Sequence, residues 1–494
     1  MDTQNLKHAG GTFGSKDNFM VVMVMILGVF VAILNETLLN VALSKIMADL
    51  GILPSTAQWL TTGYLLIIGV LIPVTAYLLQ RFTTRGLFLS AMGLFTLGTL
   101  IAALSPGFSM LVIGRILQAA GTGLLFPLLT NVVFAIVPIE KRGSAMGTIG
   151  IVITFAPAIG PTLSGIIVEH FSWRYLFYGV LPIAVFVMIF AFARLKNVTE
   201  TTKPHVDLLS LLLSTLGFGG IVYGFSSASE GYGGWSGYGV LLPIAIGVIS
   251  LALFTRRQLQ IAEPLLDLRT FQYRIFRIST LIMIIVMMAM FAAMMLLPIF
   301  LQNARGYTPF EAGLVMLPGG VIMGIMSPIT GRLFDKFGAK WLAVVGLLLI
   351  AHTLCQFAFM SVTISYLMIM LLNTSLMLGI SMLMMPVMTN ALNELPPPLY
   401  PHGTAIIGTL QQVAGAVGTA LLVTVMMNGT KQYLQNPIPG QDESTLKMLS
   451  MIAGMKNAFL LAFALVVIAL IASFFLKRSA APEKQPTAKQ VSPS

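Results

Sequence analysis

Fourteen long apolar segments run through this sequence of 494 residues, and they constrain its fold more than any single motif. A helix that crosses a bilayer needs about 20 mainly apolar residues. Its backbone polar groups must be satisfied within the segment, because hydrocarbon offers no other partners. The sequence therefore predicts an all-α integral membrane protein with 14 transmembrane helices. We place them at residues 19–46, 56–80, 86–105, 108–137, 143–168, 175–195, 208–228, 236–255, 276–302, 310–333, 339–360, 363–391, 402–428 and 458–476.

The composition indicates the same class of protein. Hydrophobic residues make up 57% of the chain and charged residues only 9%, whereas a soluble protein carries roughly 25% charged residues. A bilayer tolerates such a surface and water does not, so soluble enzymes, nucleic-acid binders and secreted scaffolds are excluded. The single cysteine, Cys355, permits no internal disulfide and no Cys-rich metal site. We expect neither a metal nor an organic cofactor.

The distribution of basic residues predicts the orientation in the membrane. An even number of spans places both termini on one side. The segments on that side carry 21 of the 28 Lys and Arg residues, the other side carries 6, and Arg115 lies within a span. Because loops rich in Lys and Arg stay in the cytoplasm, we expect a multi-pass plasma-membrane protein with both termini cytoplasmic. The same bias accounts for the net charge of +11 without any nucleic-acid partner.

An internal repeat divides the spans into two halves. Residues 72–85 and 327–340 correspond at an offset of 255, with matches at Pro73/Pro328 and Thr75/Thr330. Parallel repeats of this kind are a known transporter plan, although a chance match around a basic helix end is the alternative. The predicted organisation is a cytoplasmic N-terminus at 1–18, a six-helix bundle at 19–195, a linker with two additional helices at 196–275, a second six-helix bundle at 276–476, and a disordered cytoplasmic tail at 477–494. Within the second bundle we expect a long external loop at 429–457.

Four motifs stand out along the chain. They are Gly331-Arg-Leu-Phe-Asp-Lys-Phe-Gly-Ala-Lys340, Arg115-Ile-Leu-Gln-Ala-Ala-Gly-Thr-Gly123, Ala156-Pro-Ala-Ile-Gly-Pro-Thr-Leu-Ser-Gly165 and Leu34-Asn-Glu-Thr-Leu-Leu-Asn-Val-Ala-Leu43. In that order, the first three resemble the loop signature, the buried-arginine motif and the antiporter motif of the major facilitator superfamily. The fourth, with Ser172-Trp173-Arg174, resembles the branch of 14-helix drug:proton antiporters.

Two departures from the family pattern stand out. The first-half copy of the loop signature has Gln80 where the family usually has Asp, and Thr83 where it has Gly. In the first helix the family commonly has Asp at position 35, whereas this chain has Asn35 followed by Glu36. The carboxylate is therefore shifted by one residue.

The resemblance implies a major facilitator fold of two six-helix bundles with two inserted helices. It implies a secondary active transporter rather than an enzyme, driven by the proton gradient and bacterial in origin. The implied activity is proton-coupled multidrug efflux by alternating access, with amphipathic or cationic hydrophobic compounds as substrates. A lipid or amphiphile exporter on the same fold is the alternative. We expect a monomer in the lipid bilayer, and the sequence leaves open whether an accessory export partner is needed.

The charges inside the membrane point to the coupling site. Charged side chains are costly in a bilayer and usually functional. Glu36 is the one acidic residue well inside a span, and Arg115 is the one basic residue there. Low dielectric favours the protonated carboxyl, while a nearby guanidinium favours the ionised form, so Glu36 could exchange a proton. A static ion pair that joins the first and fourth helices is the alternative.

The remaining site residues fall into three groups. Polar residues and one methionine are expected to line a substrate cavity; methionine suits adaptable apolar surfaces but also fills cores. Proline and glycine in the fifth helix are expected to bend it and allow close packing. A loop signature is expected to form a conformational latch at the cytoplasmic face, with a membrane-anchoring basic loop as the alternative. The cavity group is Asn40, Gln58, Tyr64, Gln118, Asn131, Asn373, Met377, Gln411 and Gln412; the antiporter motif is Pro157, Gly160, Pro161 and Gly165; the latch is Gly331, Arg332, Asp335, Lys336, Gly338 and Lys340.

Overall fold

The computed structural model describes residues 16–52, 54–198, 201, 207–229, 237–361, 363–435 and 442–477. Within these ranges the chain forms fourteen long helices and no strand. They are α1 (Lys16–Leu50), α2 (Pro54–Arg81), α3 (Thr84–Ala103), α4 (Phe108–Ile136), α5 (Arg142–His170), α6 (Arg174–Arg194), α7 (Leu208–Ser229), α8 (Tyr238–Gln260), α9 (Arg274–Ile299), α10 (Pro309–Phe337), α11 (Ala339–Ala358), α12 (Tyr366–Asn393), α13 (Tyr400–Gln435) and α14 (Glu443–Ser473). The short 3-10 helices η2 (Ile139–Lys141), η4 (Leu268–Gln272) and η6 (Pro397–Leu399) lie between some of them, and the π-helical segment η5 (Phe300–Ala304) continues α9.

The helices have the length and surface of membrane spans. In the described part of the chain, thirteen helices are long and apolar enough to cross a membrane. The remaining helix, α5, has 29 residues and is also long enough to cross one. Large apolar side chains point outward, including Phe186, Ile189 and Phe192, which are 59%, 61% and 66% exposed. Since water would not tolerate such a surface, the predicted all-α membrane fold is confirmed.

The predicted external loop at 429–457 is wrong, because most of it is helical. α13 continues to Gln435 and α14 already begins at Glu443. The side chain of Asp442 accepts a hydrogen bond from the Thr445 N–H and caps the start of α14. A capping Asp followed by an acidic first turn stabilises a helix N-terminus. Hydropathy alone could not place this start, because the first turns of α14 are polar.

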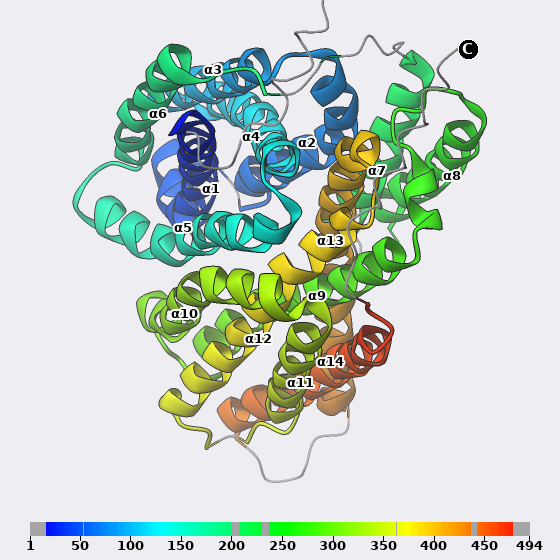
Figure 1. Cartoon of the computed structure of the whole chain (residues 1–494). Coiled ribbons are helices and arrows are strands. Elements are labelled where there is room, and N and C mark those ends of the chain that lie inside the picture. Colours follow the sequence, from blue (N-terminus) through cyan, green and yellow to red (C-terminus); the bar gives the residue numbers. More distant parts are fainter. Residues whose placement is uncertain are drawn as a thin grey trace, which may run out of the picture.

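Two six-helix halves face each other. α1–α6 form one half and α9–α14 the other, and they meet mainly where α5 packs on α10 and α2 packs on α13 (Figure 1). The internal repeat is visible in the atoms: the buried Thr75 hydroxyl donates to the Ile72 carbonyl at 2.5 Å, and the buried Thr330 hydroxyl donates to the Ser327 carbonyl at 2.9 Å. The same bond at the same offset shows that α2 and α10 are equivalent helices.

The two inserted helices form a hairpin beside the contact between the halves. α7 and α8 pack on each other, and α7 also packs on α2 of the first half and α13 of the second (Figure 1). Trp59 of α2 stacks on Tyr223 of α7, with ring centroids 5.7 Å apart. The hairpin therefore touches both halves on the α2–α13 side and leaves the α5–α10 side uncovered.

Candidate functional site

A buried arginine organises the interior of the first half. Arg115 of α4 is 2% exposed, and its guanidinium lies 3.9 Å from the centre of the Tyr64 ring on α2. Its Nε donates to the Leu60 carbonyl at 3.2 Å, and its Nη1 donates to Gln118 Oε1 at 3.1 Å. A buried cation requires such partners, and here a carbonyl, an amide and an aromatic face supply them.

The same network extends into α3. Gln118 donates to the Thr99 hydroxyl at 2.9 Å, and the Tyr64 hydroxyl donates to Thr122 at 2.8 Å. The contact between Gln118 and Thr99 depends on close packing of α3 on α4, because a Cβ added to Gly98 would lie 2.7 Å from the Gln118 backbone nitrogen. The predicted cavity residues Tyr64 and Gln118 are therefore fully engaged in positioning Arg115.

Glu36 lies on α1 beside this network without bonding to it directly. The side chain is partly buried, and Glu36, Arg115 and Tyr64 lie close enough to interact electrostatically. Among the described side chains, Glu36 forms no hydrogen bond and no salt bridge within 4.0 Å. The structure therefore does not contain the static ion pair that was the alternative for these residues. Glu36 is therefore held near a positive charge without a salt bridge to it.

The antiporter motif packs α5 on α1. A Cβ on Gly160 would overlap the Thr37 hydroxyl, and the Ser164 hydroxyl donates to the Leu38 carbonyl at 2.6 Å. Gly160 therefore lies against α1 of its own half and not against the second half. α5 meets α10 through an earlier set of glycines instead, at Gly143, Gly147 and Gly150.

The other predicted cavity residues have mixed environments. Asn131 and Asn373 are buried, and no partner for the Asn373 amide nitrogen is found in the described part of the structure. Met377 is buried, while Gln411 and Gln412 are partly exposed. Three predicted site residues have side chains that lie outside the described part: Asn40, Gln58 and Pro161.

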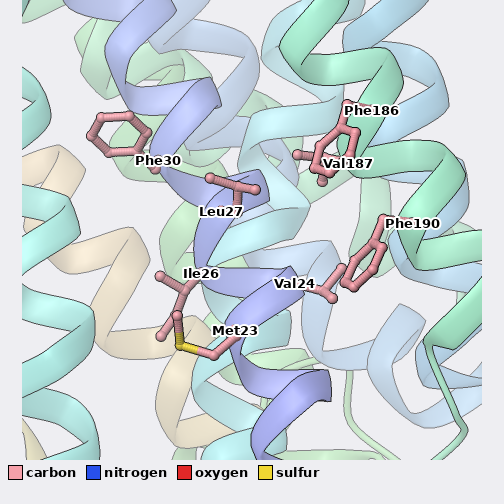
Figure 2. A pocket seen from close by; sticks show the side chains of 8 residues that line it. All are labelled: Met23, Val24, Ile26, Leu27, Phe30, Phe186, Val187 and Phe190. Atoms are coloured by element: carbon pink, nitrogen blue, oxygen red, sulfur yellow. The ribbon is translucent and has the colours of Figure 1, made fainter.

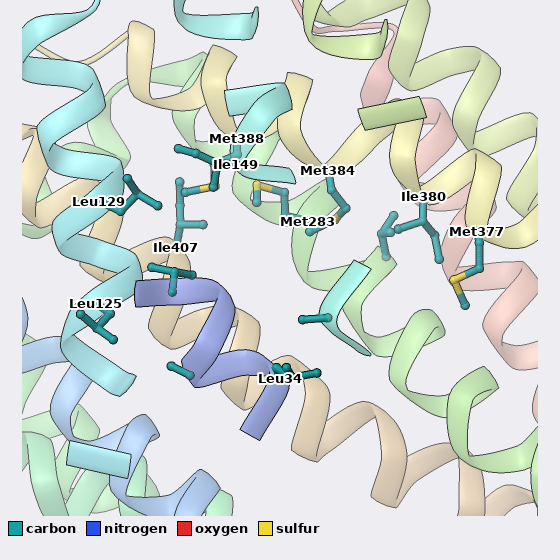
Figure 3. Packing of buried hydrophobic residues seen from close by; sticks show 14 of the residues in the cluster. Leu34, Leu125, Leu129, Ile149, Met283, Met377, Ile380, Met384, Met388 and Ile407 are labelled. Atoms are coloured by element: carbon teal, nitrogen blue, oxygen red, sulfur yellow. The ribbon is translucent and has the colours of Figure 1, made fainter. Parts of the chain in front are cut away.

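Buried apolar side chains fill the space where the two halves meet. Leu34, Leu125, Leu129 and Ile149 of the first half and methionines of the second half belong to one packed cluster (Figure 3). Because methionine side chains are unbranched and flexible, they can repack around different apolar shapes. The methionines drawn in this cluster are Met283, Met377, Met384 and Met388.

The predicted latch residue Asp335 joins the halves at one end of the bundle, which we call the terminal face because α1 begins there. Asp335, near the end of α10, accepts hydrogen bonds from the Gly143 N–H at 2.8 Å and the Ser144 N–H at 2.9 Å, and also from the Ser144 hydroxyl. These groups form the first turn of α5, where a carboxylate is favoured by free N–H groups and by the helix dipole. The Asp335 carboxylate therefore binds backbone N–H groups of the opposite half.

The rest of the latch motif shapes the end of α10. Gly331 lies so close to Gly143 that any Cβ would overlap its carbonyl, and Gly338 has a φ of +78° where the chain turns into α11. The basic members Arg332 and Lys336 are exposed, and Lys340 is partly exposed. The glycines therefore permit close approach, and Asp335 makes the polar contact.

The symmetric position in the first half carries Gln80, which makes the equivalent contact with α13. Gln80 Nε2 lies 2.9 Å from Nε2 of His402, near the start of α13. The departure from the family pattern at Gln80 thus has a physical counterpart, because its partner is an imidazole ring rather than a row of N–H groups. His402 is 8% exposed.

Sequence reasoning missed a third contact between the halves, made by Arg142. This residue is 8% exposed and donates to Asn393 Oδ1 and the Tyr400 hydroxyl, each at 3.0 Å. It also donates to the carbonyls of Phe134 and Val137. The predicted spans place Arg142 in a basic loop between two helices, and nothing in the local sequence distinguishes it from its exposed neighbour Lys141.

At the opposite face, the Ser172-Trp173-Arg174 motif ties three helix ends together within the first half. The Trp173 indole and Arg174 both donate to Asp49 Oδ2, at 2.9 and 2.8 Å, and Arg174 also donates to the Ser105 carbonyl. The Trp173 hydrogen bond and then the Arg174 contact lower the pKa of the Asp49 carboxyl below its usual value. The motif therefore has a structural role at this face.

An apolar groove of about 330 Å³ lies on the perimeter of the bundle, between α1 and α6 (Figure 2). Its lining comes from the first half alone and includes Phe30, Phe186 and Phe190. A groove on one half does not lie at the contact between the halves, so it is separate from the predicted substrate cavity.

Comparison with known proteins connects this geometry to a family. Residues 25–419 match the family model of the Major Facilitator Superfamily. The chain is 48% identical to "Lincomycin resistance protein LmrB" of Bacillus subtilis (strain 168) over 458 residues, which covers 93% of this chain and 95% of that protein. It is 31% identical to "Multidrug resistance protein B homolog" of Mycobacterium tuberculosis (strain ATCC 25618 / H37Rv), covering 82% of this chain and 75% of that protein.

A solved structure supports the fold independently. The proton:xylose symporter XylE superimposes with a TM-score of 0.63 at 16% sequence identity, covering 95% of this chain and 98% of the symporter. At this identity the likeness concerns the fold and not the substrate.

Proposed function

The chain belongs to the major facilitator superfamily and is a transporter rather than an enzyme, and from this premise we propose that it is a drug:proton antiporter that exports amphipathic compounds from a bacterial cell. The names of its relatives support drug efflux, since they include lincomycin resistance and multidrug resistance proteins. Lincomycin is accordingly the first substrate to test. The terminal face is cytoplasmic in this proposal.

One observation carries the coupling scheme: Glu36 lies within electrostatic reach of Arg115, and the two form no salt bridge. Arg115 is held by Leu60, Gln118 and Tyr64, so its position does not depend on the charge of Glu36. A fixed cation favours proton release from Glu36, and burial favours proton uptake. The carboxyl can therefore exchange a proton without rearranging the helices around it.

Proton and drug exchange through alternating access of the two halves. The contacts of Asp335, Gln80 and Arg142 hold the halves together at the terminal face. With this face cytoplasmic, the structure corresponds to a state closed to the cytoplasm, in which Glu36 takes up a proton from outside. Separation of these contacts would open the cytoplasmic side for proton release and drug entry.

The adaptable interface supports a range of substrates rather than one. Methionines of α9 and α12 lie opposite branched aliphatic side chains of α1, α4 and α5 (Figure 3). Flexible side chains can repack around differently shaped apolar molecules, and the buried amide of Asn373 offers a hydrogen-bond donor nearby on α12. Drug binding is therefore expected to depend on shape and apolar area, with few polar contacts.

The test is drug-dependent proton movement in vesicles that contain the purified protein. Lincomycin added to the wild-type protein should release protons, and an imposed pH gradient should drive its uptake in inverted vesicles. Glu36→Gln should abolish both, because the amide cannot exchange a proton, while Glu169→Gln, at an exposed position near the end of α5, should leave both unchanged. Gradient-driven transport by the Glu36→Gln protein would refute the role of Glu36.

A further inference from the structure

The hairpin of α7 and α8 ends in a chain of polar contacts that reaches the contact between the halves. At its terminal-face end, Asp207 accepts two hydrogen bonds from Arg257, at 2.8 and 3.0 Å, and one from the Ser210 hydroxyl at 2.5 Å. Ser210 is in turn bonded to Gln258 at 2.6 Å. Arg257 and the hydrogen bonds lower the pKa of Asp207 far below its usual value, so it stays ionised. These bonds join α7 to α8.

The series of polar contacts continues from α8 into the segment 261–267, which we call the hairpin linker. The buried Gln258 accepts a hydrogen bond from the Leu266 N–H at 3.1 Å. Leu265 and Leu266 are themselves buried, so this end of the linker packs against the bundle. The bond to Gln258 therefore ties the position of Leu266 to the hairpin.

The series of polar contacts ends at the imidazole ring of His402. The Asp267 N–H lies 3.2 Å from His402 Nδ1, and the other ring nitrogen contacts Gln80 at 2.9 Å. One imidazole thus touches the hairpin linker, α13 and α2 at once. Since α13 and α2 belong to different halves, a displacement of the linker must disturb their contact.

We propose that His402 is a positioning residue through which the inserted hairpin holds the α2–α13 contact closed at the terminal face. The α5–α10 contact has a carboxylate on helix N–H groups, which is a strong, charge-assisted arrangement. The α2–α13 contact has a neutral amide at the same position. The hairpin lies on this weaker side (Figure 1). There, Gln258 and the linker keep the His402 ring in place. This inference rests on the alternating access of the proposed function.

The test measures how often the terminal face opens, by thiol labelling on the far side of the interface. Ser327 is 3% exposed and lies between α5 and α10, so Ser327→Cys in a Cys355→Ala background reacts with N-ethylmaleimide when the halves separate. A reporter on the α5–α10 side detects opening of the whole face and not local loosening around His402. The assay requires no drug and no proton gradient, so it can fail or succeed independently of the proposed transport activity.

Gln258→Met removes the bonds to Leu266 and Ser210 while leaving both halves unchanged. It should raise the labelling rate at least about two- to tenfold, the range expected for one buried hydrogen bond. His402→Leu should raise it at least as much, His402→Gln should raise it less, and the double variant with Gln258→Met should add little to His402→Leu. Ser214→Ala is the matched control, because this buried hydroxyl of α7 has no partner in the described structure; its rate should equal that of the background.

Thermal unfolding in detergent shows that each variant is folded. Labelling of the Gln258→Met protein at the background rate would overturn the proposal, as would an equal increase in Ser214→Ala. If Gln258→Met does not fold, Arg257→Gln carries the same test, because it releases Asp207 at the base of the hairpin. An increase in its labelling rate would support the proposal and an unchanged rate would overturn it.

Discussion

Arg142 and Tyr400 are the first residues of α5 and α13, equivalent helices of the two halves, and they contact each other. Arg142 Nη1 donates to the Tyr400 hydroxyl at 3.0 Å, and its guanidinium lies 5.0 Å from the centre of the Tyr400 ring. The pair therefore joins the starts of two equivalent helices across the contact between the halves. We call it the central pair, and it closes the terminal face together with Asp335 and Gln80.

Removing the central pair is expected to weaken this closed face in two steps. Tyr400→Phe removes one hydrogen bond and should lower the free energy of unfolding by about 1 kcal/mol. Arg142→Met removes four hydrogen bonds and two aromatic contacts and should cost about 2–4 kcal/mol. Denaturation in detergent measures both. Equal effects of the two changes would show that the other bonds of Arg142 contribute nothing.

Asp335→Asn is expected to reduce drug efflux about 5- to 30-fold. The amide has a single oxygen for the Gly143 and Ser144 N–H groups and no charge at the N-terminus of α5, a loss of about 1–2 kcal/mol. Initial efflux rates at matched expression measure the effect. Arg332→Gln, at an exposed position of the same motif, should behave like the wild type; an equal loss there would favour a latch based on the basic residues.

Two glycines of the antiporter motif should respond in opposite ways to alanine. Gly160→Ala places a methyl group against the Thr37 hydroxyl and should cost about 1–3 kcal/mol through overpacking. Gly165→Ala meets no atom within 4 Å and should be neutral or stabilise α5 by up to about 1 kcal/mol. Thermal unfolding compares them. Partial recovery of Gly160→Ala by Thr37→Ala would confirm the contact.

The Asp207–Arg257 pair predicts a dependence of stability on pH. Because folding lowers the pKa of Asp207, its contribution is complete above the unfolded pKa of about 4 and is lost as the pH falls through the folded pKa. At pH 7, Asp207→Asn should cost roughly 1–2 kcal/mol, since Arg257 is partly exposed to solvent. Unfolding curves at decreasing pH should show the difference between the two proteins begin to shrink below about pH 4 and continue to shrink as the pH falls toward the folded pKa. A constant difference would contradict the prediction.

Arg115→Lys should impair transport although the charge is retained. Lysine cannot donate to both the Leu60 carbonyl and Gln118 while lying flat on the Tyr64 ring, because its ammonium is a compact point charge and not a planar fork. We expect a fall of at least about tenfold in proton-coupled lincomycin transport. If Arg115→Lys transports normally, charge alone suffices and the geometry of the guanidinium is unimportant.

The sequence by itself determined the class of fold and the location of the unusual charges. Fourteen apolar segments and two charged residues inside spans are local features, because each segment must satisfy its own backbone in the bilayer. The repeat at an offset of 255 is read from the sequence by comparing its two halves. The start of α14 was misplaced because its polar first turns lie beyond the stretch that hydropathy recognises.

Only the tertiary structure decided which atoms meet. The rotation of each helix and the glycines that allow close approach placed Asp335 on α5, Arg142 on Tyr400 and Gly160 on α1. The same packing kept Glu36 near Arg115 without a salt bridge. Such pairings join residues more than 70 positions apart in the chain, and hydropathy, which reads one segment at a time, carries no information about how two helices turn toward each other.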